Sequence, residues 1–406
     1  MTYLDTYHYS ASTQAAFYKA ESEIIRLDSR LARNELAQYI KEALLAIDAV
    51  FAMRISRDAE IPIVPLLAAF QLSKRKGGRN NLRRCYWSAC IGFQPSDEEL
   101  ELAVEALHYM QTIEWISDNI RADTTVTIET VLRLHEYLMS GFENDGYFRG
   151  FRSEHLPNMR GADPSTIPSA INDLCSFMNK EVFSPLGQAS AINHSFERIV
   201  PFDTMTNLCG LVLAFSALFK RGLFLNGFMA PICWGASANR EDRTKMRISS
   251  RDETTSETYE SYREDWAMFN ARNTYYSVHI TESFLDATEL LHSAWKSSSL
   301  RIPSNSAIEK LINVILGAPQ LSIKHAASII GKSYGATSEA IHQLTVAGIT
   351  REVALDNRER VFVCDQASDL INSFVEHLTD ICQHSELNPV QMTPLAWKLT
   401  EDKLMS

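Results

Sequence analysis

The side chains best placed for chemistry lie in residues 193–222, NHSFERIVPFDTMTNLCGLVLAFSALFKRG. Thr204, Thr206 and Asn207 offer hydroxyl and amide groups directly before an apolar run, which predicts the start of a buried helix. A helix N-terminus has free N–H groups and a positive dipole end that suit a phosphate, so these three residues and Asp203 are the candidate nucleotide-binding residues. Asp, Thr and Asn also cap helices, and we favour capping at this position.

The same segment resembles the active-site loop and following helix of the Fic (Fido) domain family, whose motif is HPFxDGNGRxGR, often after HxxFExI. An alignment without gaps is fixed by matches on both sides of the loop: His194, Phe196, Glu197, Ile199, Pro201, Phe202, Gly210 and Gly222. In the family this loop transfers a nucleotide fragment, usually AMP from ATP, to a hydroxyl side chain of a target protein. The resemblance therefore implies a Fic-type helical bundle.

In this alignment the residues that carry the family's chemistry are replaced. Val200 stands at the position of the general base, whose contribution is roughly 100-fold to 10,000-fold in rate. Thr204 replaces the acid that would hold magnesium, and Met205 replaces a glycine that lets the backbone approach a phosphate. The degenerate motif positions are Val200, Phe202, Thr204, Thr206, Asn207, Leu208 and Leu211, the two leucines standing where the family has phosphate-binding arginines. We expect no catalytic residue, no metal site and no cofactor; ATP and magnesium would bind only if residual activity or nucleotide sensing exists.

Two further segments carry the resemblance. LHEYLMSGFENDG at 134–146, followed by GYFRGFR at 146–152, looks like the helix, turn and GxFR signature that precede the target-docking flap of Fic proteins. Residues 154–168 then allow only a short flap hairpin, which weakens target docking by strand addition. WSACIGF at 87–93 resembles the family's inhibitory helix without its glutamate.

Composition predicts a folded, cytoplasmic protein. The chain of 406 residues, 45% of them hydrophobic, is long enough for two or three domains. Its start lacks the apolar core of a secretory signal, and its longest apolar run is too short to span a bilayer, so no membrane contact is expected. Seven scattered cysteines without a CxxC pair indicate reduced, mostly buried thiols.

Net charge argues against nonspecific binding to nucleic acid, because the formal value is −11. One local exception is the basic stretch KRKGGRNNLRR at 74–84. We favour a solvated connector there over an anion-binding loop.

Helical periodicity dominates the chain. It predicts two helices within 15–55 and further helices at 97–120, 127–141, 167–180 and 189–199, with Ser96 as the N-cap of the helix at 97–120. Residues 236–261 are polar and predict an exposed loop, after which 259–276 resumes helical character. The fold class expected is mainly α.

The C-terminal part predicts a small winged-helix (α+β) domain. Three short helices at 307–317, 323–330 and 335–348 precede REVALDNRERVFVCD, which alternates around a turn as a two-stranded wing does. The domains expected are an N-terminal helical region at 1–95, a Fic core at 96–296, the winged helix at 297–380 and a tail at 381–406. Longer Fic proteins frequently carry such a C-terminal domain.

DNA contact through this domain is an open alternative. Its candidate residues are Lys332, Ser333, Arg351, Arg358 and Arg360. Nearby carboxylates nearly cancel these cations, so protein contact is favoured slightly over DNA.

Three functions remain. The first, which we favour, is a catalytically degenerate Fic-fold protein that serves as a regulatory or interaction module with a protein partner and, as an option, as a homo-oligomer. The second is a divergent protein nucleotidyltransferase that uses ATP. The third is a winged-helix DNA-binding regulator with the Fic core as its sensor.

Overall fold

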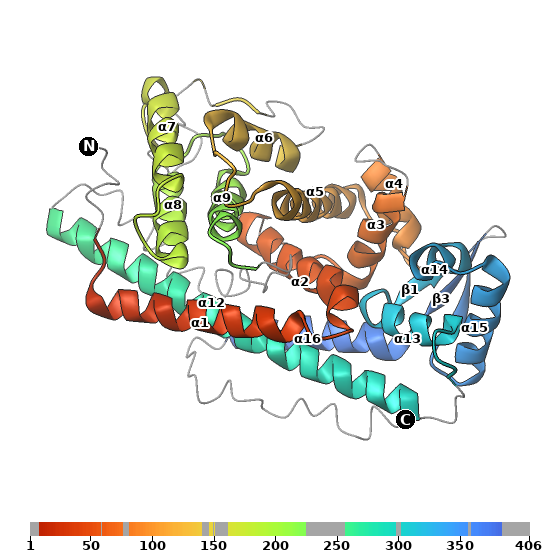
Figure 1. The fold of residues 1–406 in the computed structure, drawn as a ribbon. Coiled ribbons are helices and arrows are strands. Elements are labelled where there is room, and N and C mark those ends of the chain that lie inside the picture. The colour runs from red at the N-terminus through yellow and green to blue at the C-terminus, as the bar shows by residue number, and fades with distance from the viewer. Residues whose placement is uncertain are drawn as a thin grey trace. The chain divides into compact units, whose positions relative to one another are not determined.

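The computed structural model describes residues 8–57, 59–75, 81–139, 146–148, 150, 161–224, 256–297, 302–355 and 359–383. The described chain is mainly helical with one small sheet, as predicted (Figure 1). It divides into two compact units. The first unit takes residues 1–32, 51–59 and 108–278, and the second takes 33–50, 60–107 and 279–406. The domain boundaries expected from sequence stay predictions.

The helices are α1 (Ala11–Leu31), α2 (Ala37–Arg57), α3 (Ile63–Arg75), α4 (Leu82–Ala89), α5 (Asp97–Asn119), α6 (Ile128–Met139), the 3₁₀ turn η3 (Pro164–Thr166), α7 (Ile167–Met178), α8 (Pro185–Ile199), α9 (Thr206–Lys220), α12 (Ser256–Ser297), α13 (Ala307–Gly317), α14 (Ile323–Ile330), α15 (Tyr334–Val346) and α16 (Asp365–Gln383). The strands are β1 (Gln320–Ser322), β2 (Arg351–Leu355) and β3 (Glu359–Val363). None of the described helices is long and apolar enough to cross a bilayer.

Local capping chemistry sets several of these bounds. The Glu99 N–H donates to Ser96 Oγ at 3.2 Å and the Ser96 N–H donates to Glu99 Oε2 at 2.7 Å, which is a capping box and confirms Ser96 as the N-cap of α5. Helix α8 begins earlier than the predicted Ala189. The Ser184 hydroxyl accepts from the Gly187 N–H and Pro185 occupies the first turn, where its missing N–H costs nothing.

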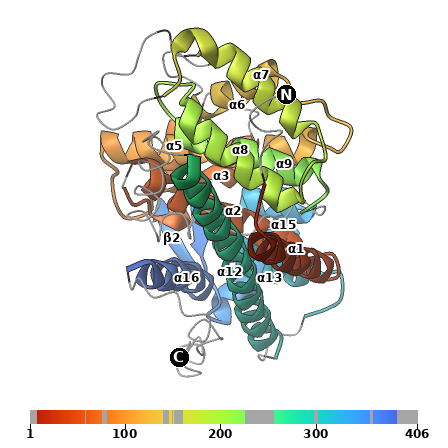
Figure 2. The same ribbon diagram turned by 90° about the vertical axis from the view of Figure 1, so that its left-hand side faces the viewer.

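In the first unit, α8 and α9 pack against each other, and α6, α7 and α1 surround them. Helix α1 runs beside the start of α12 in both views (Figures 1 and 2). The Ser10 N–H donates to Glu264 Oε1 at 2.7 Å, and Lys19 Nζ lies 4.4 Å above the Tyr275 ring. The buried Glu21 of α1 accepts from the Leu186 N–H at 2.7 Å, so α1 also fixes the first turn of α8.

The second unit contains the sheet, whose strands run antiparallel in the order β1-β3-β2. The three predicted helices at its C-terminal end and the predicted strand pair at 351–363 are confirmed. Strand β1 was missed, because three residues between two helices give too little alternation to register as a strand. It pairs Leu321 with Phe362, whose side chains are both buried.

Other expectations fall on residues outside the described ones. These are residues 154–160 of the short flap hairpin at 154–168, most of the polar stretch at 236–261, and nearly all of the tail at 381–406. Buried free thiols among the described side chains are those of Cys85, Cys90, Cys175, Cys209 and Cys364.

Candidate functional site

The candidate site is the motif loop, residues 200–205, which joins α8 to α9 in the first unit. Helix α8 ends at Ile199, and the N–H of its C-cap residue Val200 donates to the Phe196 carbonyl at 3.0 Å. Pro201 follows and cannot continue the helix. Helix α9 begins at Thr206 and is buried along almost its whole length, as its apolar sequence predicts. The loop is therefore held between two packed helices.

Val200 occupies the position that the resemblance assigns to the general base. Its side chain is 0% exposed, and its backbone is left-handed with φ 48° and ψ 63°. A β-branched residue seldom adopts this conformation, because its Cβ substituents crowd the carbonyl. The position therefore presents buried hydrocarbon and no proton acceptor.

Met205 is also left-handed, with φ 53°, directly before α9. The resemblance places a glycine here, and glycine is the residue that adopts this conformation without a steric penalty. The backbone at this position thus has the conformation expected of a glycine, although the residue is a methionine.

Replacing Met205 should reveal this strain. We expect Met205→Gly to be more stable than Met205→Ala by about 1 kcal/mol, since both remove the side chain and only alanine keeps a Cβ in the left-handed region. Urea unfolding of the two variants measures the difference. Equal stabilities would contradict the strained turn.

Thr206 closes the loop onto itself. Its hydroxyl donates to the Phe202 carbonyl at 2.8 Å and accepts from the Phe202 N–H at 3.2 Å. The expected side-chain cap of α9 is not made by its N-cap residue, which is Met205. The short loop explains this, because Thr206 reaches back to Phe202 instead of forward along the helix.

His135 of α6 fastens the loop from the side. The Gly146 N–H donates to His135 Nδ1 at 3.2 Å, so Nδ1 is the acceptor and the ring proton sits on Nε2. Nε2 lies 3.2 Å from the Thr204 carbonyl and donates to it. The ring also stacks on Phe202 with centroids 3.7 Å apart and planes 5° from parallel. We call this set of contacts the His135 latch.

The sequence did not single out His135. It lies in the helix that resembles the family, but a buried histidine at helical spacing resembles an ordinary core residue. Only the contact with the Thr204 carbonyl shows what it does.

The four candidate nucleotide-binding residues do come together around the loop. Thr204 is exposed and its hydroxyl donates to Met139 Sδ at 3.4 Å, whereas Asp203 and Asn207 are half-buried. Thr206 is 7% exposed and engaged with Phe202. Leu208 and Leu211, at the former arginine positions, are buried in the α9 packing. The loop thus presents packing and internal hydrogen bonds at the positions where the resemblance expects phosphate ligands.

Gly210 has a structural reason to be glycine. A Cβ built there would lie 3.0 Å from Phe196 Cδ1 and 3.4 Å from Asn193 Nδ2, so α8 and α9 approach closely at this point. The thiol of neighbouring Cys209 is fully buried, and burial raises its pKa, which leaves it a poor nucleophile.

His194 lies on α8 and is 3% exposed, with its ring 5.8 Å from the Trp266 ring. Burial lowers its pKa to about 3, helped by the charges of Arg198 and Arg263. The neutral ring is therefore part of the packed core.

The folded state holds His194 neutral from its ordinary pKa of 6.5 down to about 3, while the unfolded chain protonates it. Stability is thus lost as pH falls through this window. Between pH 7.5 and pH 5 the wild type should lose about 2 kcal/mol more than His194→Gln, measured by urea unfolding at both values. The exposed His8→Gln is the matched control and should lose as much as the wild type; equal losses in all three proteins would contradict the assignment.

The candidate DNA-contacting residues of the second unit are largely engaged. Arg351 donates to both carboxylate oxygens of Asp365 at 2.6 and 2.9 Å, and Arg360 lies 3.7 Å from Glu352. Ser333 caps α15 by accepting from the Ala336 N–H at 3.3 Å, and Lys332 is half-buried. Arg358 lies outside the described residues.

The outward side of α15 is not cationic. Glu339 accepts from Gln343 Nε2 at 3.0 Å, and the large exposed apolar side chains are Tyr334 and Val346, at 58% and 76% exposed. Across the described parts of both units, no group of three or more His, Cys, Asp or Glu side chains is arranged to hold a metal ion.

Comparison with known proteins assigns the first unit's central segment. Residues 125–213 match the Fic/DOC family. A Fic family protein from Desulfovibrio desulfuricans G20 shares 15% identity over 88% of this chain and 97% of its own, with a TM-score of 0.49. A Fic domain containing signaling protein from Bacteroides thetaiotaomicron VPI-5482 shares 11% identity over 64% and 95%, with a TM-score of 0.44. No curated protein matches the chain. The residues that match this family run from α6 into α9 and include the motif loop.

Proposed function

We propose that this chain is a catalytically degenerate Fic-fold protein that acts in the cytoplasm as a regulatory or interaction module and transfers no nucleotide. The observation that carries the proposal is Val200, fully buried at the position of the general base. Leu208 and Leu211 support it, because buried leucines at the arginine positions offer no charge to a phosphate. Thr206 and the His135 latch support it further, since they tie the motif loop to its own scaffold.

The strongest alternative is a divergent protein nucleotidyltransferase that uses ATP and magnesium. Such an enzyme must bind ATP with the motif loop open to the phosphates. It would need another base, and the hydroxyl of Thr204 is the exposed polar group at the loop. Compared with a carboxylate, a neutral hydroxyl is a weak base and a weak magnesium ligand.

The DNA-binding alternative has less support from the structure than from the sequence. The proposed winged helix presents Glu339 and exposed apolar side chains on α15, while Arg351 is paired with Asp365. A protein partner suits this surface better than phosphate.

Isothermal calorimetry with ATP and magnesium tests the proposal. We expect no saturable heat with the wild type. Saturable heat that vanishes when residues 204–207 are replaced by alanine would favour the nucleotidyltransferase or a nucleotide sensor. Silence with ATP together with a DNA mobility shift at low salt would favour the DNA-binding regulator.

A further inference from the structure

A cavity with a volume of about 610 Å³ lies beside α6 in the first unit. Its main lining residues are Trp115, Glu129, Leu132, Arg133, Glu136 and Tyr147, which we call the α6 groove. All of them belong to the first unit. A volume of this size is within the range of sites that hold ligands or peptide side chains.

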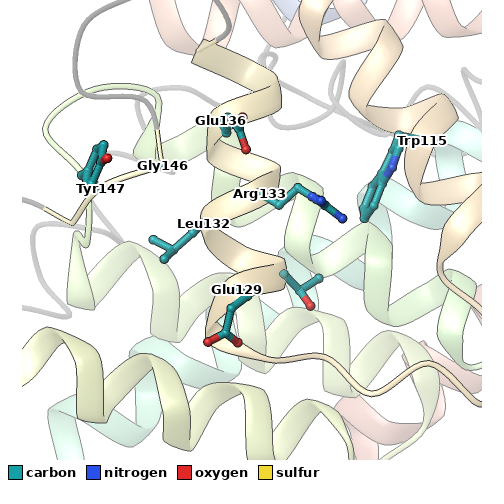
Figure 3. Close-up of a pocket in the computed structure, with 8 residues that line it drawn as sticks. Trp115, Glu129, Leu132, Arg133, Glu136, Gly146 and Tyr147 are labelled. Atoms are coloured by element: carbon teal, nitrogen blue, oxygen red, sulfur yellow. The ribbon is translucent and has the colours of Figure 1, made fainter.

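Aromatic rings form two walls of the groove. Trp115 comes from α5 and Tyr147 from the segment after α6, and Figure 3 shows them on opposite sides of the helix. Tyr147 is 73% exposed. Exposed tyrosine and half-buried tryptophan are the residue types that anchor protein partners.

Charge alternates along the helix between these walls. Glu129, Arg133 and Glu136 lie at spacings of four and three residues, which place them on neighbouring turns of one face of α6, with Arg133 between the two glutamates in order along the helix. The carboxylates lie about 10 Å apart along the helix axis. Among the described residues, no ion pair involves Arg133 or Glu136. In Figure 3 Arg133 reaches toward Trp115 and away from Glu136.

We propose that the α6 groove docks an extended segment of a protein partner that presents a basic, an acidic and a basic side chain in that order. Alternate side chains of an extended segment face the same way, about 6.6 Å apart, so the outer two of three alternate residues lie about 13 Å apart. Long basic side chains can bend inward from there to two carboxylates about 10 Å apart. The outer cations meet Glu129 and Glu136, and the central carboxylate meets Arg133. The aliphatic stems of the basic side chains lie against Tyr147 and Trp115. The face of each aromatic ring also attracts the cation at the end of the side chain.

The groove adjoins the His135 latch. Tyr147 follows Gly146, whose N–H donates to His135 Nδ1, and Nε2 of the same ring holds the Thr204 carbonyl. A partner on Tyr147 thus sits one residue from the contact that fastens the motif loop. The inference rests on the proposed interaction role and adds the chemistry of the partner. Peptide binding and nucleotide binding are measured separately, so the docking proposal and the proposed function can fail independently.

Two fluorescent peptides test the proposal by polarisation with the full-length protein. One carries Arg-Ala-Glu-Ala-Arg and the other Arg-Ala-Lys-Ala-Arg. The protein's net charge of −11 alone would favour the second peptide. We expect the first to bind about three- to tenfold more tightly, because its carboxylate meets Arg133. A preference for the second peptide, equal affinities, or no binding of the first would each overturn the proposal.

Variants localise the contact. Arg133→Glu should reverse the preference between the two peptides, and Glu129→Gln with Glu136→Gln should weaken the first peptide about five- to tenfold. The matched control is Asp123→Asn with Asp173→Asn, which removes the same charge at exposed positions of the first unit outside the groove and should leave binding unchanged. Equal weakening by both double variants would overturn the proposal in favour of bulk charge. Free arginine amide binding as tightly as the first peptide would assign the groove to a small cation instead.

Discussion

Gly317→Ala is expected to destabilise the second unit by about 3 kcal/mol. Gly317 is the last residue of α13, and a Cβ built there would lie 1.6 Å from the Tyr39 carbonyl oxygen and 2.5 Å from the Tyr39 carbonyl carbon. Both neighbours are backbone atoms of α2, so no side-chain rotation can make room. Gln71 Nε2 of α3 also donates to the Gly317 carbonyl at 3.0 Å, which binds a third helix to the same point.

The matched control for this variant is Gly335→Ala in α15. Nothing lies within 4 Å of a Cβ built at Gly335, and alanine favours a helix more than glycine does. This control should keep or gain up to about 1 kcal/mol in the free energy of unfolding, measured by urea titration with circular dichroism. If Gly317→Ala unfolded at the same urea concentration as Gly335→Ala, the close approach of α13 to α2 would be wrong.

His135→Ala is the second large effect, with an expected cost of about 3 kcal/mol. The variant removes the ring stacked on Phe202 and leaves the Gly146 N–H and the Thr204 carbonyl without their partner. His135→Phe keeps a flat ring on Phe202 but has no nitrogen, so it should recover part of the loss and still cost about 1–2 kcal/mol.

Amide hydrogen exchange separates this latch from general packing. The Phe202 N–H is held by Thr206 Oγ1 inside the motif loop, and its exchange should speed up in His135→Ala more than that of amides in α7. A variant that lost stability with unchanged exchange in residues 200–206 would show that His135 packs the core without fastening the loop.

The sequence predicted much of the fold because local chemistry dictates it. Ser96 and Glu99 form their capping box within one helical turn, and the helices from α13 to α15 follow from short periodic runs between polar breaks. Strand β1 could not be predicted, since its three residues become a strand only by pairing with β3. Whether such a short strand forms depends on its tertiary contacts.

In the candidate site, too, the sequence predicted what depends on the local sequence and missed what depends on contacts between distant segments. Alignment placed Val200, Met205 and Leu208 at the critical positions, and the left-handed backbone at Met205 agrees with a former glycine there. The capping expected from the polar residues at the start of α9 is not made by its N-cap residue, Met205, and the Thr206 hydroxyl turns back to Phe202. His135 and the α6 groove depend on contacts between segments, and no spacing in the sequence reports such contacts.

Label transfer from radiolabelled ATP tests the central claim most directly. The purified protein, alone and with extract from its own cells, is incubated with ATP and magnesium, and a variant with residues 204–207 replaced by alanine is the control. The account predicts no labelled band that depends on the wild-type protein, because Val200 cannot accept a proton and the former arginine positions hold buried leucines. A labelled protein that appears with the wild type and disappears with the variant would contradict the account.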